Sequence, residues 1–371
     1  MVDVPTNSLI FRLIEELAPK EKAYSWDNVG LQIGSANQKA TKVMITLDVV
    51  ESVVDEAIEK DVNLIIAHHP LFFNPLKRIN VDTPEGKIIS KLIRHDITVY
   101  AAHTNLDVVA SGVNDMLAKR LKLQNNKTLI SLGKERMYKF AVYVPTSHIE
   151  AIKNVIGDVG GGEQGDYSHC SFEIKGIGSF KPIKGADPYI GKVGEITKVD
   201  EAKIEVLVTE SKLNEVKKAV LKAHPYEEPA YDIIELANEG AEYGLGRIGD
   251  LSERIILDDY VKLMKQQLGL NHVRVAGNLE KEIKKVAIIG GSGEKYIHQA
   301  KRAGADVYIT GDLGFHQAQT AIQIGLAVID AGHYIEEIMK EEIKDYLQKK
   351  LASNNVEIIV SDTNTDPFQY I

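Results

Sequence analysis

Two stretches of this chain carry the same order of strands and helices, and this repeat constrains the fold more than any other feature. In the first stretch, continuous apolar runs at residues 42–47, 62–67 and 97–102 predict buried strands, and residues 53–60 predict a helix. Strands that are apolar along their whole length need cover on both faces. The pattern therefore predicts a parallel sheet with helices on either side.

The second stretch follows about two thirds of the way along the chain. Strands are predicted at residues 285–289, 306–310 and 327–330, with a helix at residues 296–303. The first two strands match those of the first stretch without a gap, since 285 − 42 and 306 − 63 both equal 243, whereas the third matches at 327 − 98 = 229. The shared order, spacing and polar strand ends favour an internal duplication over two unrelated βαβ units.

The segment between the two copies has a different texture. Predicted strands and helices alternate there as a doubled βαβ, with strands at 137–144, 171–174, 203–208 and 231–236 and helices at 148–156 and 212–223. This order is typical of a ferredoxin-like module. We therefore predict an α/β protein with two related α/β lobes, residues 1–127 and 238–371, that form one domain, and an inserted ferredoxin-like α+β module at residues 128–237.

Histidines and carboxylates follow the predicted strands of both copies. Because ligands bind at the carboxyl ends of parallel strands, these side chains are expected to share one edge of each sheet. Imidazole and carboxylate are ordinary ligands of zinc, iron and manganese. The residues concerned are His68, His69, His103 and Asp107 in the first copy and Asp312, His333, Glu336 and Glu337 in the second. A pair of adjacent histidines is usually structural. Histidines and carboxylates at four strand ends together, however, favour a metal site.

The adjacent residues His68 and His69 point in different directions, so one ion does not easily take both. Two ions about 3.5–4 Å apart, bridged by carboxylates, satisfy both. Glu336 and Glu337 each share a helix face with His333. The offset of 229 places Glu336 opposite Asp107, which makes Glu336 the first choice as ligand and Glu337 the reserve.

Three other segments have two interpretations each. His316 follows Asp312 by four residues and is either an acid or base above the site or a solvated helix histidine. The glycine-rich run 290–293 is a tight strand-to-helix turn or an anion contact, and the turn is favoured. The run 224–229, which contains a histidine and two prolines, is a gate or a stiff connector.

Composition removes several classes of function. The single Cys170 excludes disulfides within the chain and cysteine-rich zinc sites. A net charge of −9 gives no strong nucleic-acid signal, and we expect a cytoplasmic protein without membrane segments.

The strand-end motifs, together with the run 26–32, resemble those of the Nif-three-like family, also called the GTP cyclohydrolase 1 type 2 homologue family. The central part resembles the insertion of its long bacterial members. The resemblance implies a dinuclear site with ligands at His68, His69, Asp107, His333 and Glu336, and a homohexamer as the oligomer. It implies two divalent ions per subunit, with zinc as the first choice and iron or manganese as alternatives.

The family name further implies a metal-dependent hydrolase of a nucleotide-like small molecule, acting by GTP ring opening or by phosphoester cleavage. His103, His316 and Glu337 are the candidates for moving a proton in that reaction. The alternatives are a non-catalytic protein that responds to metal or nucleotide and a metal that only ties the two lobes together.

Overall fold

The computed structural model of the chain describes residues 3–369 and divides them into two compact units. The described parts of residues 1–132 and 243–371 form unit 1, and Gly133–Glu242 form unit 2. The inserted module was expected at 128–237. The difference arises because strands β5 (Gln124–Pro145) and β8 (Tyr231–Ile256) continue through both boundaries, which no change of period marks. Within residues 3–369, no helix combines the length and the apolar character needed to cross a membrane.

The first sheet of unit 1 has the strand order β1-β4-β3-β2-β13. All of its strands run parallel except β1, which pairs antiparallel with β4. The strands are β1 (Gly30–Ile33), β2 (Lys42–Thr46), β3 (Leu64–Ala67), β4 (Thr98–Ala101) and β13 (Glu357–Val360). From the sequence, residues 238–371 were all expected in the second lobe. In the structure β13 pairs with β2, because this four-residue strand carries no sequence signal for one sheet edge over another.

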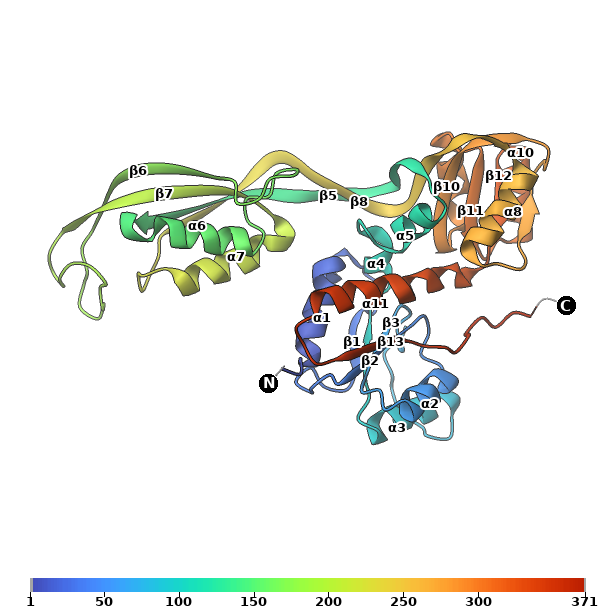
Figure 1. The fold of residues 1–371 in the computed structure, drawn as a ribbon, viewed down its shortest axis with the longest axis horizontal. Helices are drawn as coiled ribbons and strands as arrows, with labels where there is room; N and C mark the ends of the chain where they lie inside the picture. Colours follow the sequence, from blue (N-terminus) through green and yellow to red (C-terminus); the bar gives the residue numbers. More distant parts are fainter. Residues whose placement is uncertain (1–2, 370–371) are drawn as a thin grey trace. The chain divides into compact units, whose positions relative to one another are not determined.

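Helices cover both faces of this sheet, as Figure 1 shows. Successive strand residues alternate between two clusters of buried side chains, so that Val43 and Ile45 lie in one and Met44 in the other. The first cluster contains side chains of α1 (Asn7–Leu17) and α11 (Met339–Lys350), and the second those of α2 (Glu51–Glu59) and α3 (Pro84–Arg94). Cover on both faces explains why these strands are apolar along their length.

The second lobe repeats the arrangement of the first. Its three parallel strands are β10 (Glu282–Ser292), β11 (Val307–Gly311) and β12 (Ala327–Asp330), and an antiparallel strand β9 (Arg274–Ala276) pairs with β12 as β1 pairs with β4. The C-terminal part of β8 pairs antiparallel with β10. The helices of this lobe are α8 (Leu257–Leu268), α9 (Ile297–Arg302) and α10 (Phe315–Gln323). The common strand order supports the predicted duplication.

A continuous core joins the two lobes into unit 1. One cluster of buried apolar side chains includes Ile14 and Ile66 from the first lobe, Leu117 from α5 (Val113–Arg120) and Ile288 from the second lobe. The neighbouring Asn114 side chain donates to the Asp107 carbonyl oxygen at 2.9 Å and accepts from the Gly290 N–H at 3.0 Å. The short helix α4 (Thr104–Val108), which contains Asp107, is thereby tied to the end of β10.

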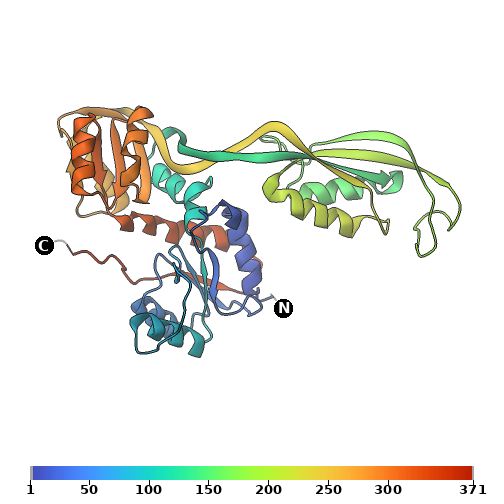
Figure 2. The same ribbon diagram turned by 180° about the vertical axis from the view of Figure 1, so that it is seen from behind.

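Unit 2 has the element order β5-α6-β6-β7-α7-β8, the βαββαβ order expected for the inserted module. The strand order is β6-β7-β5-β8, and both β5 and β6 pair antiparallel with β7. Figures 1 and 2 show the two helices on the same face of these strands. The remaining bounds are α6 (Ile149–Asp158), β6 (Ser171–Phe180), β7 (Thr197–Thr209) and α7 (Glu210–Ala223).

The run 224–229 forms a stiff connector between α7 and β8. His224 is buried, and its Nε2–H donates to the Tyr143 carbonyl oxygen at 2.9 Å while its Nδ1 accepts from the Tyr226 N–H at 3.0 Å. Both ring nitrogens are thus used within unit 2, and the connector interpretation is the one that these contacts support.

Unit 2 has its own core, and we expect its stability to change independently of unit 1. The Ile152 side chain is fully buried among α6, α7 and the strands. Ile152→Ala removes buried methyl and methylene groups and should lower the free energy of unfolding of unit 2 by about 2–5 kcal/mol. Denaturant titration followed by hydrogen exchange of unit 2 peptides and by the metal content of unit 1 measures the two units separately.

The matched control is Ile174→Ala on the exposed side of β6, where the side chain is 47% accessible and the expected change is below about 0.5 kcal/mol. If Ile152→Ala shifted the denaturant midpoint of metal loss as far as the midpoint of unit 2 unfolding, the two cores would not be independent.

Candidate metal centre

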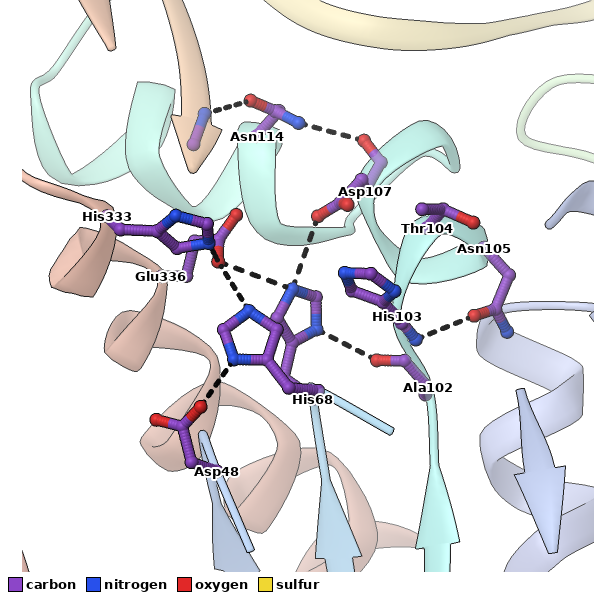
Figure 3. Close-up of polar contacts among 12 residues, drawn as sticks. Asp48, His68, Ala102, His103, Thr104, Asn105, Asp107, Asn114, His333 and Glu336 are labelled. Carbon is purple, nitrogen blue, oxygen red and sulfur yellow. Dashed lines mark hydrogen bonds and ion pairs between the residues drawn. The ribbon is translucent and has the colours of Figure 1, made fainter. Parts of the chain in front are cut away.

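The ends of corresponding strands in the two lobes bring the predicted ligands to one place (Figure 3). His68 and His69 follow β3, and α4 presents Asp107 after β4. In the second lobe a 3-10 helix, His333–Ile338, follows β12 and carries Glu336. Asp107 and Glu336, related by the offset of 229, thus occupy equivalent short helices after equivalent strands. The duplication explains why one carboxylate reaches the centre from each lobe.

Burial and one hydrogen bond fix the protonation state of His68. The side chain is fully buried, and its Nδ1 lies 2.8 Å from the Ala102 carbonyl oxygen, which can only accept. Nδ1 therefore carries the hydrogen. Burial lowers the pKa of His68 to about 3, so the ring is neutral near pH 7 and its Nε2 presents a lone pair.

This lone pair faces two groups that also accept. The His68 Nε2 lies 3.5 Å from Asp107 Oδ1 and 3.7 Å from Glu336 Oε2. Neither His68 Nε2 nor Asp107 Oδ1 has a hydrogen-bond partner within residues 3–369, although both atoms are buried. Converging buried acceptors without a donor are costly, because each has lost its hydration without compensation. A divalent cation satisfies all three atoms at once, and the donor set fits one.

His69 and His333 converge on the same Glu336 oxygen. The Nε2 atom of each ring lies 3.2 Å from Glu336 Oε2. Each Nδ1 is held by an aspartate, with Asp48 Oδ1 at 2.7 Å from His69 and Asp312 Oδ2 at 2.7 Å from His333. A carboxylate on the far nitrogen is the usual support of a metal-ligating histidine, because it fixes the ring and raises its basicity.

The proton distribution follows from these contacts. Burial alone would lower the pKa of His69, but Asp48 and Glu336 raise it to about 10. The hydrogen bond to Glu336 is the largest cause that raises the pKa of His333 to about 9. Burial, and then the Glu336 charge, hold the pKa of Asp107 well above its usual range. For Glu336 itself, the bonds from His333 and His69 outweigh the effect of burial and lower the pKa. Two protons thus lie where a cation would bind.

Among residues 3–369, three sets of side chains have ligand atoms close enough to share an ion. They are His68 with Asp107 and Glu336, His69 with His333 and Glu336, and His68 with His69 and His103, and in each set the atoms lie within 4.8 Å of one another. His103 was among the strand-end candidates and was then assigned to moving a proton, not to the ligand set. Its Nδ1 lies 2.9 Å from Asp27 Oδ1, so a carboxylate orients this imidazole ring as well.

The glycine-rich run after β10 makes room for Glu336. Gly291 has φ of +63°, and a Cβ atom on it would lie 2.4 Å from Glu336 Oε1. The Gly290 and Gly293 N–H groups donate within the protein, to Asn114 Oδ1 at 3.0 Å and Thr310 Oγ1 at 2.9 Å. These contacts support the interpretation as a tight turn.

A cavity of about 1070 Å³ opens over the centre, and residues of both lobes line it. Its lining is acidic and aromatic. The acidic side chains are Asp48, Asp107, Glu294, Asp312, Glu336, Glu337 and Asp366. The aromatic side chains other than histidine are Tyr24, Trp26, Phe73, Tyr296, Tyr334 and Phe368. Among the described lining residues, Lys295 is the only lysine or arginine.

The predicted proton carriers differ in position. Glu337 lines the cavity but lies 3.1 Å from Lys340 Nζ, outside the three ligand sets. His316 is exposed on α10, where its Nδ1 lies 3.3 Å from Gln319 Oε1, and it does not line the cavity. Of the two interpretations of His316, these contacts support the solvated helix histidine, because its position in α10 turns the ring to solvent.

Three aspartates orient histidines, and two of them, Asp27 and Asp48, were absent from the predicted candidates, whereas Asp312 was among the strand-end candidates but not as the partner of His333. Asp48 follows β2 at the same sheet edge as His69, which is the signal that points to it. Asp27 and Asp312 stand in motifs that the sequence analysis used, but their partners are far away in sequence.

The comparisons with known proteins agree with this geometry. The family model of Duf34/NIF3 (NGG1p interacting factor 3) matches residues 5–367. The chain belongs to this family. A Bacillus subtilis (strain 168) protein named GTP cyclohydrolase 1 type 2 homolog is 49% identical over 364 residues, 98% of either chain. A protein of the same name from Halalkalibacterium halodurans is 45% identical over 370 residues, 99% of this chain and 100% of the relative.

A solved structure of this Duf34/NIF3 family has the same fold over the whole chain. The Bacillus cereus protein related to NIF3 superposes with a TM-score of 0.89 at 46% identity and full coverage of both chains. A Staphylococcus aureus protein superposes with a TM-score of 0.72 at 37% identity, also with full coverage. The resemblance found in the motifs is thus confirmed.

A substitution at Gly291 should remove metal by displacing Glu336. In Gly291→Ala the new Cβ meets the carboxylate, and we expect metal bound per chain to fall by half or more. The matched control is Gly165→Ala, which has a similar φ of +56° but nothing within 4 Å of the Cβ position. Both variants pay about 1 kcal/mol for the left-handed backbone, so only the clash differs. Elemental analysis after dialysis measures the metal, and equal content in the two variants would contradict the assignment.

Metal binding should release protons from His69 and His333. Their pKa values of about 10 and 9 leave both rings protonated at pH 7, whereas a metal ligand must be neutral. We expect one proton from each ring, and an apparent affinity that rises with pH up to about 9–10. Calorimetric titration in buffers of different ionisation enthalpy counts the protons.

In the metal-free protein, stability should fall as the pH rises, whereas the affinity for metal should increase. Both pKa values lie above the unfolded value of about 6.5, so their contribution to stability is complete below that pH and is lost as pH rises through 9–10. Proton release near zero at pH 7, with thermal stability flat over this range, would show that these rings are neutral before metal binds.

Proposed function

We propose that the chain holds two divalent cations and uses them to hydrolyse a nucleotide-like substrate. His68, Asp107 and Glu336 would hold one ion, and His69, His333 and Glu336 the other, with Glu336 shared. The observation that carries this proposal is the meeting of buried acceptors, His68 Nε2 and Asp107 Oδ1, that no donor in the described chain satisfies. Zinc suits imidazole and carboxylate ligands, and iron or manganese suits them nearly as well.

Such ions, when bound, act as Lewis acids toward a substrate oxygen and make water more acidic. The chain supplies the rest of the site. Asp48 and Asp312 fix the His69 and His333 rings, and the Ala102 carbonyl fixes His68. The large cavity gives a small molecule access to the exposed side of His333 and to Glu337.

His103 is the best-placed residue to move a proton. Its Nδ1 is held by Asp27, and its ring centroid lies 5.3 Å from that of His68 and 5.4 Å from that of His69. The Asp27 carboxylate also accepts from the Thr104 N–H and hydroxyl, and these bonds together with His103 overcome burial and lower its pKa to about 2. The Asp27 carboxylate thus fixes the orientation of the His103 ring.

The relatives named GTP cyclohydrolase 1 type 2 homolog support a nucleotide-like substrate, and two products separate the possible reactions. Opening of a guanine ring releases formate, and ester cleavage releases inorganic phosphate. The test is a turnover screen with zinc-, iron- and manganese-loaded protein against a panel of nucleotides, with both products measured.

His69→Ala removes a ligand of the second ion and should lower kcat at least 100-fold. His316→Ala is the matched control, because it removes a histidine from the same unit outside the cavity and should leave kcat within twofold. Turnover that is equal in the two variants, or absent with every metal, would remove the hydrolase. Metal and nucleotide binding without turnover would favour the regulatory alternative.

A further inference from the structure

Two exposed aromatic side chains stand beside His103 at the edge of the cavity. Trp26 and Phe73 are 62% and 53% accessible, although both are large and apolar. Their rings lie edge-on to His103, with centroids at 6.1 Å for Trp26 and 5.8 Å for Phe73. Trp26 also stacks on Tyr24 at 5.9 Å, which fixes its plane. Exposed, oriented aromatic rings next to a polar centre are suited to hold a flat ring, because base stacking on such rings is favourable.

The charge of the same cavity limits what that flat ring can carry. Seven acidic side chains line the cavity, and Lys295 is the only described lysine or arginine there. Two divalent ions would offset four of these charges, Lys295 one more and Lys340, which pairs with Glu337, another, so the lining keeps a net negative charge. A phosphate monoester brings about −1.5 to −2 charge at pH 7, and each further phosphate adds to it. Sites that bind polyphosphates instead surround the phosphate groups with several Arg, Lys or backbone N–H donors.

We propose that the cavity takes a nucleoside or a nucleoside monophosphate, with the base against Trp26 and Phe73, and that it discriminates against nucleoside triphosphates. The inference rests on the proposed function, since it names the substrate class of that metal centre. Lys295, whose Nζ lies 5.0 Å from the Tyr296 ring centroid, is the cation available to a single phosphate. The Gly290 and Gly293 N–H groups are already bonded within the protein and cannot cradle a polyphosphate.

Trp26 provides the readout, because it is the only tryptophan of the chain. Selective excitation of its fluorescence in the zinc-loaded protein reports a base stacked on this ring. We expect GMP to quench at a Kd at least tenfold lower than that of GTP, and inorganic tripolyphosphate to leave bound GMP in place. Zinc content is measured after each titration, so that removal of metal by GTP is not taken for weak binding.

Two pairs of variants separate stacking from charge. Phe73→Ala should raise the Kd for GMP about fivefold or more, whereas Phe172→Ala, an exposed phenylalanine of unit 2, should leave it unchanged. Asp366→Asn removes one lining carboxylate and should lower the ratio of the Kd for GTP to the Kd for GMP. Asp362→Asn, which removes an acid that pairs with Lys60 outside the cavity, should not.

The outcomes distinguish this inference from the proposed hydrolysis. GTP that binds as tightly as GMP, or no quenching by any nucleotide, overturns the inference. Turnover of triphosphates with a lower KM than monophosphates overturns it while the hydrolase stands. Tight GMP binding without release of formate or phosphate retains the inference and removes the hydrolase.

Discussion

The structure depends on a place where two buried acceptor atoms, His68 Nε2 and Asp107 Oδ1, meet beside Glu336 without a hydrogen-bond donor among the described residues. His68 cannot turn its lone pair away, because the Ala102 carbonyl holds its other nitrogen, and Asp107 and Glu336 have only oxygens to offer. Desolvation of such groups costs several kcal/mol unless a cation or proton compensates. In the metal-free chain the imidazolium protons of His69 and His333 compensate Glu336, while burial and the Glu336 charge hold the pKa of Asp107 well above its usual range. A metal ion replaces these protons, so the site and the stability of unit 1 are linked.

The duplication explains how one chain builds such a place. Each lobe alone offers a sheet edge with a few polar side chains, and each contributes one carboxylate to the centre from the short helix after its third parallel strand, Asp107 in the first and Glu336 in the second. Only when the two edges face each other do Asp107 and Glu336 approach the same histidine. The shared core around Leu117 and Ile288, and the Asn114 link between α4 and β10, hold the edges in this position. The chemistry therefore needs both ends of the chain, while unit 2 has a core of its own.

The strands of both lobes were predictable from the sequence, because buried parallel strands are apolar along their whole length. The apolar runs located β2, β3, β4 and their counterparts, and the offset of 229 selected Glu336 over Glu337 before any geometry was known. The aspartates that orient the rings were not predictable in the same way. Asp48 and Asp27 act across 21 and 76 positions, through hydrogen bonds that no local pattern encodes. The place of His316 stayed open because its spacing from Asp312 says nothing about which side of α10 faces the cavity. The place of β13 in the first sheet likewise depends on a tertiary edge contact.

The central claim is that the orphaned acceptors of His68 and Asp107 are metal ligands. Anomalous diffraction from crystals grown with zinc tests it most directly, since it locates the ion independently of activity. The account predicts anomalous density within about 2.0–2.2 Å of His68 Nε2 and of an Asp107 carboxylate oxygen, with a second peak near His69 and His333. Well-ordered crystals with zinc bound only elsewhere, or with no anomalous density between His68 and Asp107, would contradict it.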